Sequence, residues 1–177
     1  MKWKNVDAGQ GYYYITATFT RWLPLLRRHE IRAIVCAEIA TAIAGCGGSV
    51  TAFVLMPGHL HLLVYLPREG VLHRFCMLWR GRSARRITAL LEEHGEHAVL
   101  AVMAEHATKG RRYAVWKEQV RTLPITGRTK LNAMVNYIHA NPVRKHLANN
   151  PADWPFSSYR FYERGDNAML EIVPPVL

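Results

Sequence analysis

The sequence lacks the features of membrane, secreted and disulfide-rich proteins. It has 3 cysteines, Cys36, Cys46 and Cys76, and this odd number without CxxC spacing indicates neither a disulfide framework nor a zinc knuckle. No apolar run reaches the roughly 18 to 20 residues of a membrane-spanning helix, because Arg32 and Glu38 interrupt the longest candidate, IRAIVCAEIATAIAG. The N-terminal MKWKNVDAGQ lacks the apolar segment of a signal peptide. We therefore expect a soluble, cytoplasmic protein with reduced thiols.

Acidic residues are also few. The chain has 13 Asp and Glu against 23 Lys and Arg, a formal net charge of +10. This excess favours a polyanionic partner, nucleic acid ahead of an anionic membrane surface. The chain has no P-loop motif, internal repeat or low-complexity segment, and 177 residues with a hydrophobic fraction of 50% suit one folded domain over residues 1–177. We place its core at about 10–148 and a C-terminal tail at 149–177.

The first half of the chain alternates between strand and helix patterns. Residues 12–20, YYYITATFT, alternate as a half-buried strand does. Apolar residues recur at helical spacing over about 27–44, and GCGG at 45–48 supplies the stop. The runs SVTAFVLM and HLHLLVYL, separated only by Pro57 and Gly58, then predict a β-hairpin with a type II turn.

The second half adds two helices and one strand. Residues 70–94 predict a helix bent around Gly81, and residues 113–123 a fourth strand. Leu131, Met134, Val135 and Ile138 predict a third helix that ends near Asn141 and Pro142, while residues 92–112 carry no motif that we can assign. The order β-α-β-β-α-β-α predicts an α+β fold with a ferredoxin-like split βαβ core, an antiparallel sheet with helices on one face, and an added C-terminal helix.

Two pairs of polar residues stand out against this apolar pattern. His59 and His61, in MPGHLHLLVYLP, lie on the same face of one strand about 7 Å apart, close enough to converge on one divalent ion or one phosphate. The alternative is two partly exposed histidines on the solvent side of a sheet. Tyr137 and Asn141 are four residues apart and share one flank of the third helix. The alternative for them is a rim residue and a helix-terminating residue before Pro142.

Three ordered motifs carry a resemblance to a known family. GHLHLLVYLP, YIHANPVRKHL and DWPFSSYR together resemble the REP-associated tyrosine transposases, a branch of the single-tyrosine HUH transposases, and the resemblance extends from YYYITATFT to SSYR. It implies a ferredoxin-like fold whose C-terminal helix carries a nucleophilic tyrosine, Tyr137. It also implies that His59, His61 and Asn141 bind a divalent cation, Mg²⁺ or Mn²⁺, with His139 as an alternative third ligand. The implied substrate is single-stranded DNA with a palindromic hairpin.

The implied activity is a metal-dependent single-stranded DNA endonuclease and strand transferase. A free tyrosine has a pKa of about 10 and is mostly protonated at neutral pH, so attack on a phosphodiester needs a cation that polarises the phosphate. A 5′-phosphotyrosine link and a free 3′-OH would form, and the link keeps the bond energy needed for rejoining. One alternative is a domesticated DNA-binding protein of the same fold without turnover. The other is a metallohydrolase of small phosphoesters, which the positive net charge and the lack of the carboxylates that such sites usually contain disfavour.

Basic residues indicate where DNA would lie. The densest cluster is Arg80, Arg82, Arg85 and Arg86, for which the alternative is a solvated helix face. Lys2 and Lys4 flank Trp3 in a short arm suited to phosphates or bases, and a flexible terminus is the alternative. Arg144, followed by Lys145, lies close enough to Asn141 to hold phosphates near the tyrosine. The sequence leaves open whether the protein is a monomer or a homodimer.

Overall fold

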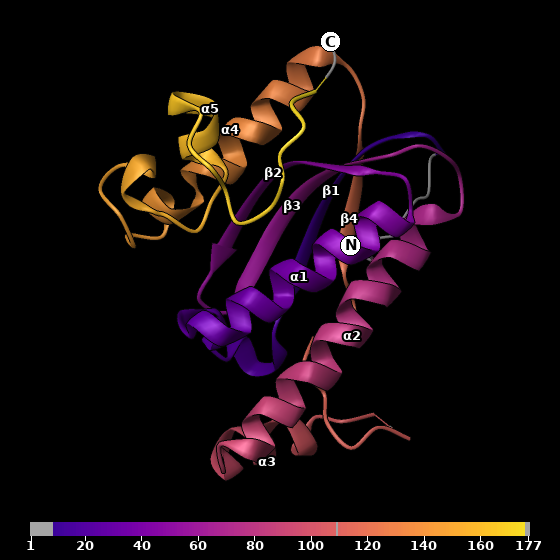
Figure 1. Ribbon diagram of the computed structural model, residues 1–177, viewed down its shortest axis with the longest axis vertical. Coiled ribbons are helices and arrows are strands. Elements are labelled where there is room, and N and C mark those ends of the chain that lie inside the picture. The colour runs from indigo at the N-terminus through magenta and orange to yellow at the C-terminus, as the bar shows by residue number, and fades with distance from the viewer. Residues whose placement is uncertain (1–8, 109, 176–177) are drawn as a thin grey trace.

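A four-stranded antiparallel sheet forms the centre of the molecule (Figure 1). The computed structural model describes residues 9–108 and 110–175. Within them, the strand order is β2-β3-β1-β4. The strands are β1 (Gly11–Thr18), β2 (Ser49–Met56), β3 (His59–Leu66) and β4 (Arg121–Ile125).

Helices connect the strands in the order expected for a ferredoxin-like core. The helices are α1 (His29–Gly45), α2 (Val71–Glu93), α3 (His97–Glu105), α4 (Arg128–Arg144) and α5 (Tyr159–Arg164), and three short 3-10 turns are η1 (Thr20–Trp22), η2 (Leu25–Arg27) and η3 (Pro151–Asp153). Strand β3 lies between β1 and β2, which is the split βαβ arrangement. The predicted fold class is confirmed.

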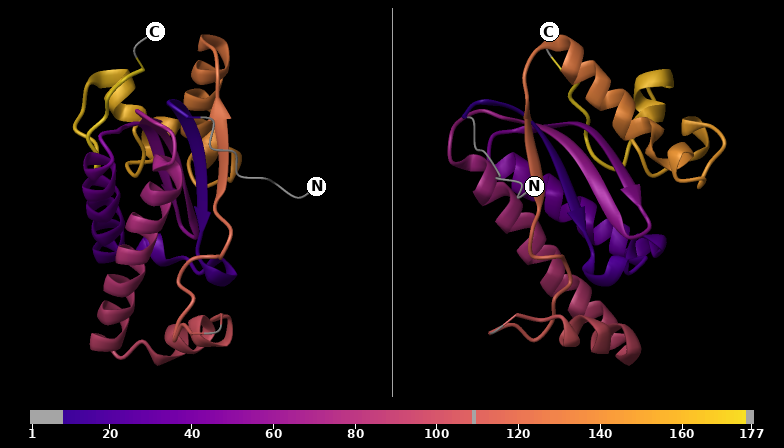
Figure 2. Two further views of the ribbon diagram at one scale, coloured as in Figure 1. Left: turned by 90° about the vertical axis from the view of Figure 1, so that its right-hand side faces the viewer. Right: turned by 180° about the vertical axis from the view of Figure 1, so that it is seen from behind.

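The two faces of the sheet are covered by different helices. Helices α1 and α2 lie on one face and α4 lies on the other (Figure 2). Because side chains alternate along a strand, Leu60, Leu62 and Val64 of β3 join the apolar core beneath α1 and α2. Leu63 joins a second cluster with residues of α4. His59 and His61, in the same parity as Leu63, therefore lie on the α4 face.

The β2–β3 hairpin turn differs from the prediction. Gly58 lacks the positive φ that the third residue of a type II turn requires. Glycine is needed at this position for a steric reason instead, since a Cβ there would lie 2.6 Å from the backbone oxygen of Trp22. The Phe19 amide donates to the Gly58 carbonyl at 3.0 Å and the Leu26 amide to the Pro57 carbonyl at 3.0 Å. The hairpin turn is thus packed directly against η1.

The second half of the chain departs from the prediction in four places. Helix α2 is continuous through Gly81, and β4 begins at Arg121, although Trp116 forms an isolated bridge with Phe19. The unassigned stretch 92–112 contains α3, which buries Leu100 and Met103. Helix α4 continues through Pro142 to Arg144, because the proline removes only its own amide donor and the Lys145 amide still donates to the Asn141 carbonyl at 3.0 Å.

The cysteines match the expectation of reduced, buried thiols. Cys36, Cys46 and Cys76 are free and buried. Burial raises the pKa of Cys36 and of Cys76 to about 12, so these thiols stay protonated.

In residues 9–108 and 110–175 we also find no helix that is both long enough and apolar enough to span a bilayer.

Candidate active site

The predicted site residues meet in one cavity between the sheet and α4. The cavity has a volume of about 480 Å³. Strands β1 and β3 and helix α4 supply most of its polar side chains, which are Tyr14, Thr16, His59, His61, Tyr137 and Asn141. Two motifs that are about 70 residues apart in the sequence therefore line the same cavity.

The two histidines of β3 face each other closely. Their ring centroids are 4.9 Å apart. Nδ1 of His61 lies 2.7 Å from the Tyr14 hydroxyl and 2.9 Å from Oγ1 of Thr16, since Thr16 is directly opposite His61 in the β1–β3 register. When His61 carries its proton on Nδ1 and donates it to one of these oxygens, the lone pair of Nε2 is free to bind a cation.

Burial keeps both imidazoles neutral. Burial is the main cause that lowers the pKa of His61 to about 3, and repulsion by a protonated His59 and by Lys145 contributes. Burial also lowers the pKa of His59 to about 4, again with help from Lys145. Neutral imidazole is the form that coordinates metal ions, so both side chains are in that form at neutral pH.

Tyr137 reaches the histidines within the same chain. Its ring centroid lies 6.0 Å from that of His61 and 6.0 Å from that of Tyr14. Its side chain is 37% exposed, and the guanidinium of Arg144 lies 5.0 Å over its ring. A nucleophile has to be reachable by its substrate, and this exposed position at the cavity mouth allows that.

Tyr14 connects the tyrosine to the histidine pair. It shares hydrogen bonds with both His61 and Tyr137. Burial, above all, raises the pKa of Tyr14 well above that of a free tyrosine. Its hydroxyl therefore stays protonated at neutral pH and remains available as a donor next to Tyr137.

Asn141 and His139 take different places on α4. The Asn141 side chain is buried, donates from Nδ2 to the Tyr137 carbonyl at 2.7 Å and is hydrogen-bonded to His61. Nε2 of His139 lies 2.8 Å from Oγ of Ser158, and its ring contacts Tyr159, on the side of the C-terminal tail. Asn141 lines the cavity and His139 does not.

The donor set suits a divalent cation with open coordination positions. Within the described part of the chain, no group of three or more His, Cys, Asp and Glu residues is placed to hold a metal ion. The cavity offers instead two neutral imidazoles and, from Asn141, one amide oxygen. Nitrogen and oxygen donors of this kind fit Mn²⁺ or Mg²⁺, which keep waters or bind phosphate oxygens in the remaining positions.

The predicted DNA-binding arginines separate into different roles. Arg80 donates to the backbone carbonyls of Lys117 and Glu118, and Arg86 pairs with Glu38 at 2.9 Å. Both therefore have partners inside the protein. Arg82 is half-buried on α2, while Arg85 is exposed and lines a groove of about 670 Å³ with Arg80, Arg111 and Arg112. Lys2 and Lys4 lie outside the described residues.

Sequence reasoning missed several residues that complete the cavity. Tyr14 and Thr16 hold Nδ1 of His61, Trp22 lies with its ring centroid 5.1 Å from that of His59, and Arg121 lines the same cavity. The period of two in YYYITATFT already places Tyr14 and Thr16 on one face. The β1–β3 register decides which residues of β3 lie opposite Tyr14 and Thr16, and this register cannot be derived from the sequence.

The fold is that of a tyrosine transposase of known structure. A REP-associated tyrosine transposase solved with a REP hairpin bound has a TM-score of 0.63 and 18% sequence identity, over 98% of this chain and 92% of that one. A proposed transposase from Deinococcus radiodurans has a TM-score of 0.49 and 18% identity, over 78% of this chain and 95% of that one. No family model and no curated protein matches the chain. At this identity the first likeness establishes a shared fold.

Proposed function

We propose that the protein is a single-tyrosine transposase of the REP-associated type, a metal-dependent endonuclease and strand transferase acting on single-stranded DNA near palindromic hairpins. The observation that carries the proposal is the approach of the Tyr137 ring to that of His61, 6.0 Å between centroids, in one chain. The shared fold with a transposase solved with a REP hairpin supports it. So does the net charge of +10.

Each residue of the cavity has a distinct task in this proposal. The Tyr137 oxygen attacks the scissile phosphate, forms a 5′-phosphotyrosine bond and releases the 3′-oxygen as a hydroxyl. Tyr14 donates a hydrogen bond to the Tyr137 oxygen, which favours the developing phenolate. Arg144, over the Tyr137 ring, and Lys145, at the cavity wall, attract the phosphate.

His59, His61 and Asn141 are the residues that would hold the cation. A bound Mg²⁺ or Mn²⁺ would polarise the phosphate and offset its negative charge. Tyr14 and Thr16 orient His61 through Nδ1, as outer partners of a metal-binding histidine do. One chain supplies all of these groups, so we propose that the protein cleaves DNA without a tyrosine from a second chain.

The test is formation of a covalent protein–DNA adduct. Wild-type protein is incubated with a DNA hairpin carrying single-stranded flanks and Mn²⁺ or Mg²⁺, and the adduct is detected by denaturing electrophoresis. Tyr137→Phe should lower its yield by at least about a thousand-fold, since it removes the nucleophilic oxygen. Tyr12→Phe, on the same strand face as Tyr14, should leave it unchanged.

The outcomes separate this proposal from its alternative. An adduct that persists in Tyr137→Phe would show that another residue is the nucleophile. Tight hairpin binding without any adduct, in either metal ion, would favour a DNA-binding protein of the same fold that has no turnover.

A further inference from the structure

Trp22 is an exposed aromatic residue held in an unusual backbone conformation. Its side chain is 56% exposed, the largest such fraction among the exposed aromatic residues of the described ranges. Both Arg21 and Trp22 have left-handed backbone conformations, with φ of 52° and 58°. Non-glycine residues rarely adopt this conformation unless their surroundings impose it, and such residues cluster at ligand-binding sites.

The surroundings of Trp22 do impose that conformation. The Trp22 amide donates to the Phe19 carbonyl at 3.0 Å, and the Leu23 amide to the Thr20 carbonyl at 3.1 Å. Gly58, directly before His59, allows the Trp22 backbone oxygen to approach to a distance that no Cβ would permit. The Trp22 backbone is therefore fixed relative to the histidine strand, and the indole contacts the His59 ring with 5.1 Å between ring centroids.

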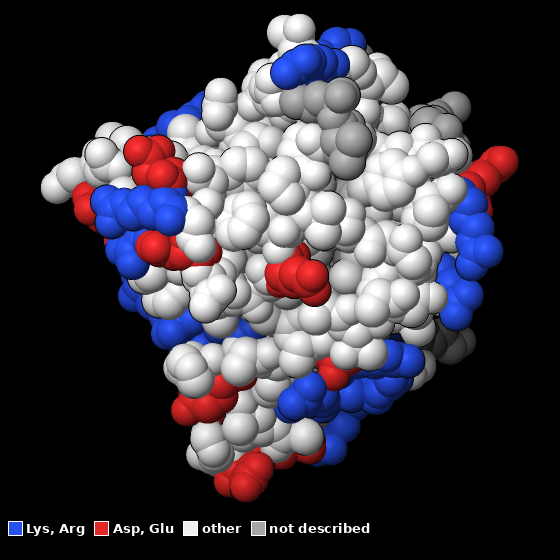
Figure 3. Space-filling model, turned by 45° about the horizontal axis from the view of Figure 1, so that its top comes forward, with Lys and Arg blue, Asp and Glu red and all other residues white. Residues whose placement is uncertain are grey.

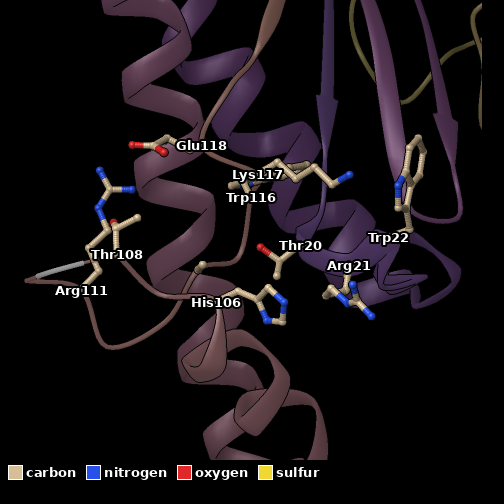
Figure 4. A pocket seen from close by; sticks show the side chains of 10 residues that line it. Thr20, Arg21, Trp22, His106, Thr108, Arg111, Trp116, Lys117 and Glu118 are labelled. Atoms are coloured by element: carbon tan, nitrogen blue, oxygen red, sulfur yellow. The ribbon is translucent and has the colours of Figure 1, made fainter.

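Trp22 also lines a second cavity (Figure 4). It has a volume of about 580 Å³, within the range that holds a nucleotide-sized ligand. In Figure 4 the Lys117 side chain extends toward Trp22, and its Nζ lies 4.7 Å from the centre of the indole ring. Other polar residues line the wall, namely Arg21, His106, Thr108, Arg111 and Glu118.

Shared walls join this cavity to its neighbours. Trp22 lines both it and the cavity of the histidine pair. Arg111 and Trp116 line both it and the arginine groove on α2. On the face shown in Figure 3, Lys and Arg side chains lie toward the margins, and acidic side chain atoms lie near the otherwise uncharged centre. The three cavities therefore adjoin one another through shared wall residues, and their linings contain more basic than acidic side chains.

We propose that Trp22 stacks on one unpaired base next to the scissile phosphate, and that the cavity beyond it leads that strand toward the arginines of α2. This rests on the proposed function. A cation lies over one face of the indole, so the base stacks on the other face, and the Lys117 ammonium meets an adjacent phosphate. Stacking tolerates every base, because each has a π-face.

Arg80 has a positioning role in this site. Its guanidinium donates to the carbonyls of Lys117 and Glu118, while the Lys117 amide donates to the Thr18 carbonyl at 2.8 Å. The segment that carries Lys117 is thereby fixed between α2 and the end of β1. Arg80, one of the four clustered arginines, thus holds the segment that carries Lys117.

The test measures DNA binding without cleavage. Hairpins with randomised single-stranded flanks are selected for binding to Tyr137→Phe protein, and abasic sites are then placed one at a time in the flanks of a selected DNA. Trp22→Gly is introduced into the same protein, because glycine adopts a positive φ without strain and so removes the indole while keeping the fold. Trp22→Phe retains a stacking ring, and Met169→Ala is a remote control.

We expect one flank position at which loss of the base weakens binding by about ten-fold in the Tyr137→Phe protein, the effect of losing one stacked base. Trp22→Gly should weaken binding of intact DNA by about the same factor and abolish sensitivity at that position. Trp22→Phe should retain most of that sensitivity, and Met169→Ala all of it.

The results that would overturn the inference differ from those that would overturn the proposed function. An unchanged abasic profile in Trp22→Gly would overturn the inference even where wild-type protein forms the adduct. A profile that changes as expected, with no adduct from wild-type protein, would sustain the inference and overturn the proposed cleavage. Failure of the whole pool to bind would overturn both.

Discussion

The two faces of β3 carry opposite kinds of side chain within one strand. Leu60, Leu62 and Val64 are fully buried beneath α1 and α2 in a continuous apolar core. On the other face, Leu63 packs against α4, but His59 and His61 open into a cavity that also contains Tyr137. One face contributes stability and the other leaves room for chemistry, so substitutions of adjacent residues should have separable effects.

The largest effect on stability should come from the apolar face. Leu62→Ala removes a fully buried side chain and leaves a void, and should lower the free energy of unfolding by about 2–5 kcal/mol. Urea denaturation measures this change. Adduct formation per folded molecule should be retained, and a parallel loss of both properties would show that the two faces are not independent.

Substitution of the neighbouring residue, His61, should affect adduct formation more than stability. His61→Ala removes a proposed metal ligand and should lower adduct formation by at least about 100-fold, whereas the free energy of unfolding should fall by only about 1–3 kcal/mol, the cost of leaving the buried partners of the ring unpaired. Exposed His73 on α2 provides the control, since His73→Ala should change neither. Adduct formation at the wild-type rate in His61→Ala would remove this histidine from the site.

Gly58→Ala tests the contact between the hairpin turn and η1. The added methyl group would overlap the Trp22 backbone oxygen, and we expect destabilisation by about 1–3 kcal/mol. Gly81→Ala is the matched control, because a Cβ at this helical position meets open space and should stabilise by about 0.5–1 kcal/mol. Thermal unfolding of the two variants should therefore shift in opposite directions.

The smallest effect should come from the partner of the histidine. Tyr14→Phe removes the hydroxyl that lies 2.7 Å from Nδ1 of His61, and should lower adduct formation by about ten-fold. Tyr12→Phe changes a tyrosine on the same strand face without touching His61. Equal rates in the two variants would show that Thr16 alone orients the imidazole and that the hydrogen bond from Tyr14 to Tyr137 does not contribute.

The sequence predicted most of the fold because the periodic elements are long. Helices α1, α2 and α4 and strands β1–β3 follow from the spacing of their apolar residues. Helix α3 was missed, although Leu100 and Met103 have helical spacing, because the stretch around it is apolar on several sides and has no clear stop. Pro142 predicts the end of α4, yet the helix continues to Arg144.

The candidate site could be predicted only in part, because sequence patterns report neighbours along one element and not contacts between elements. Local periods place His59 beside His61 and Tyr137 beside Asn141, and the structure brings these pairs into one cavity. The chemical roles of these four residues stay predictions. The partners of Arg80 and Arg86 are separated from them by tens of residues, so no local pattern distinguishes these arginines from free DNA ligands. Trp22 was missed because its exposure depends on a turn conformation without a helix or strand period.

Because one chain supplies the whole proposed site, the site fixes how many DNA ends one chain can hold at a time. Each chain contributes one proposed nucleophile, Tyr137, and under the proposed function its oxygen is bonded to DNA once a strand is attached. The chain is then occupied until a 3′-hydroxyl reverses the bond, so one molecule holds one DNA end at a time. Exchange of strands between two ends therefore requires two chains, or one chain that completes its first rejoining before it takes the second end.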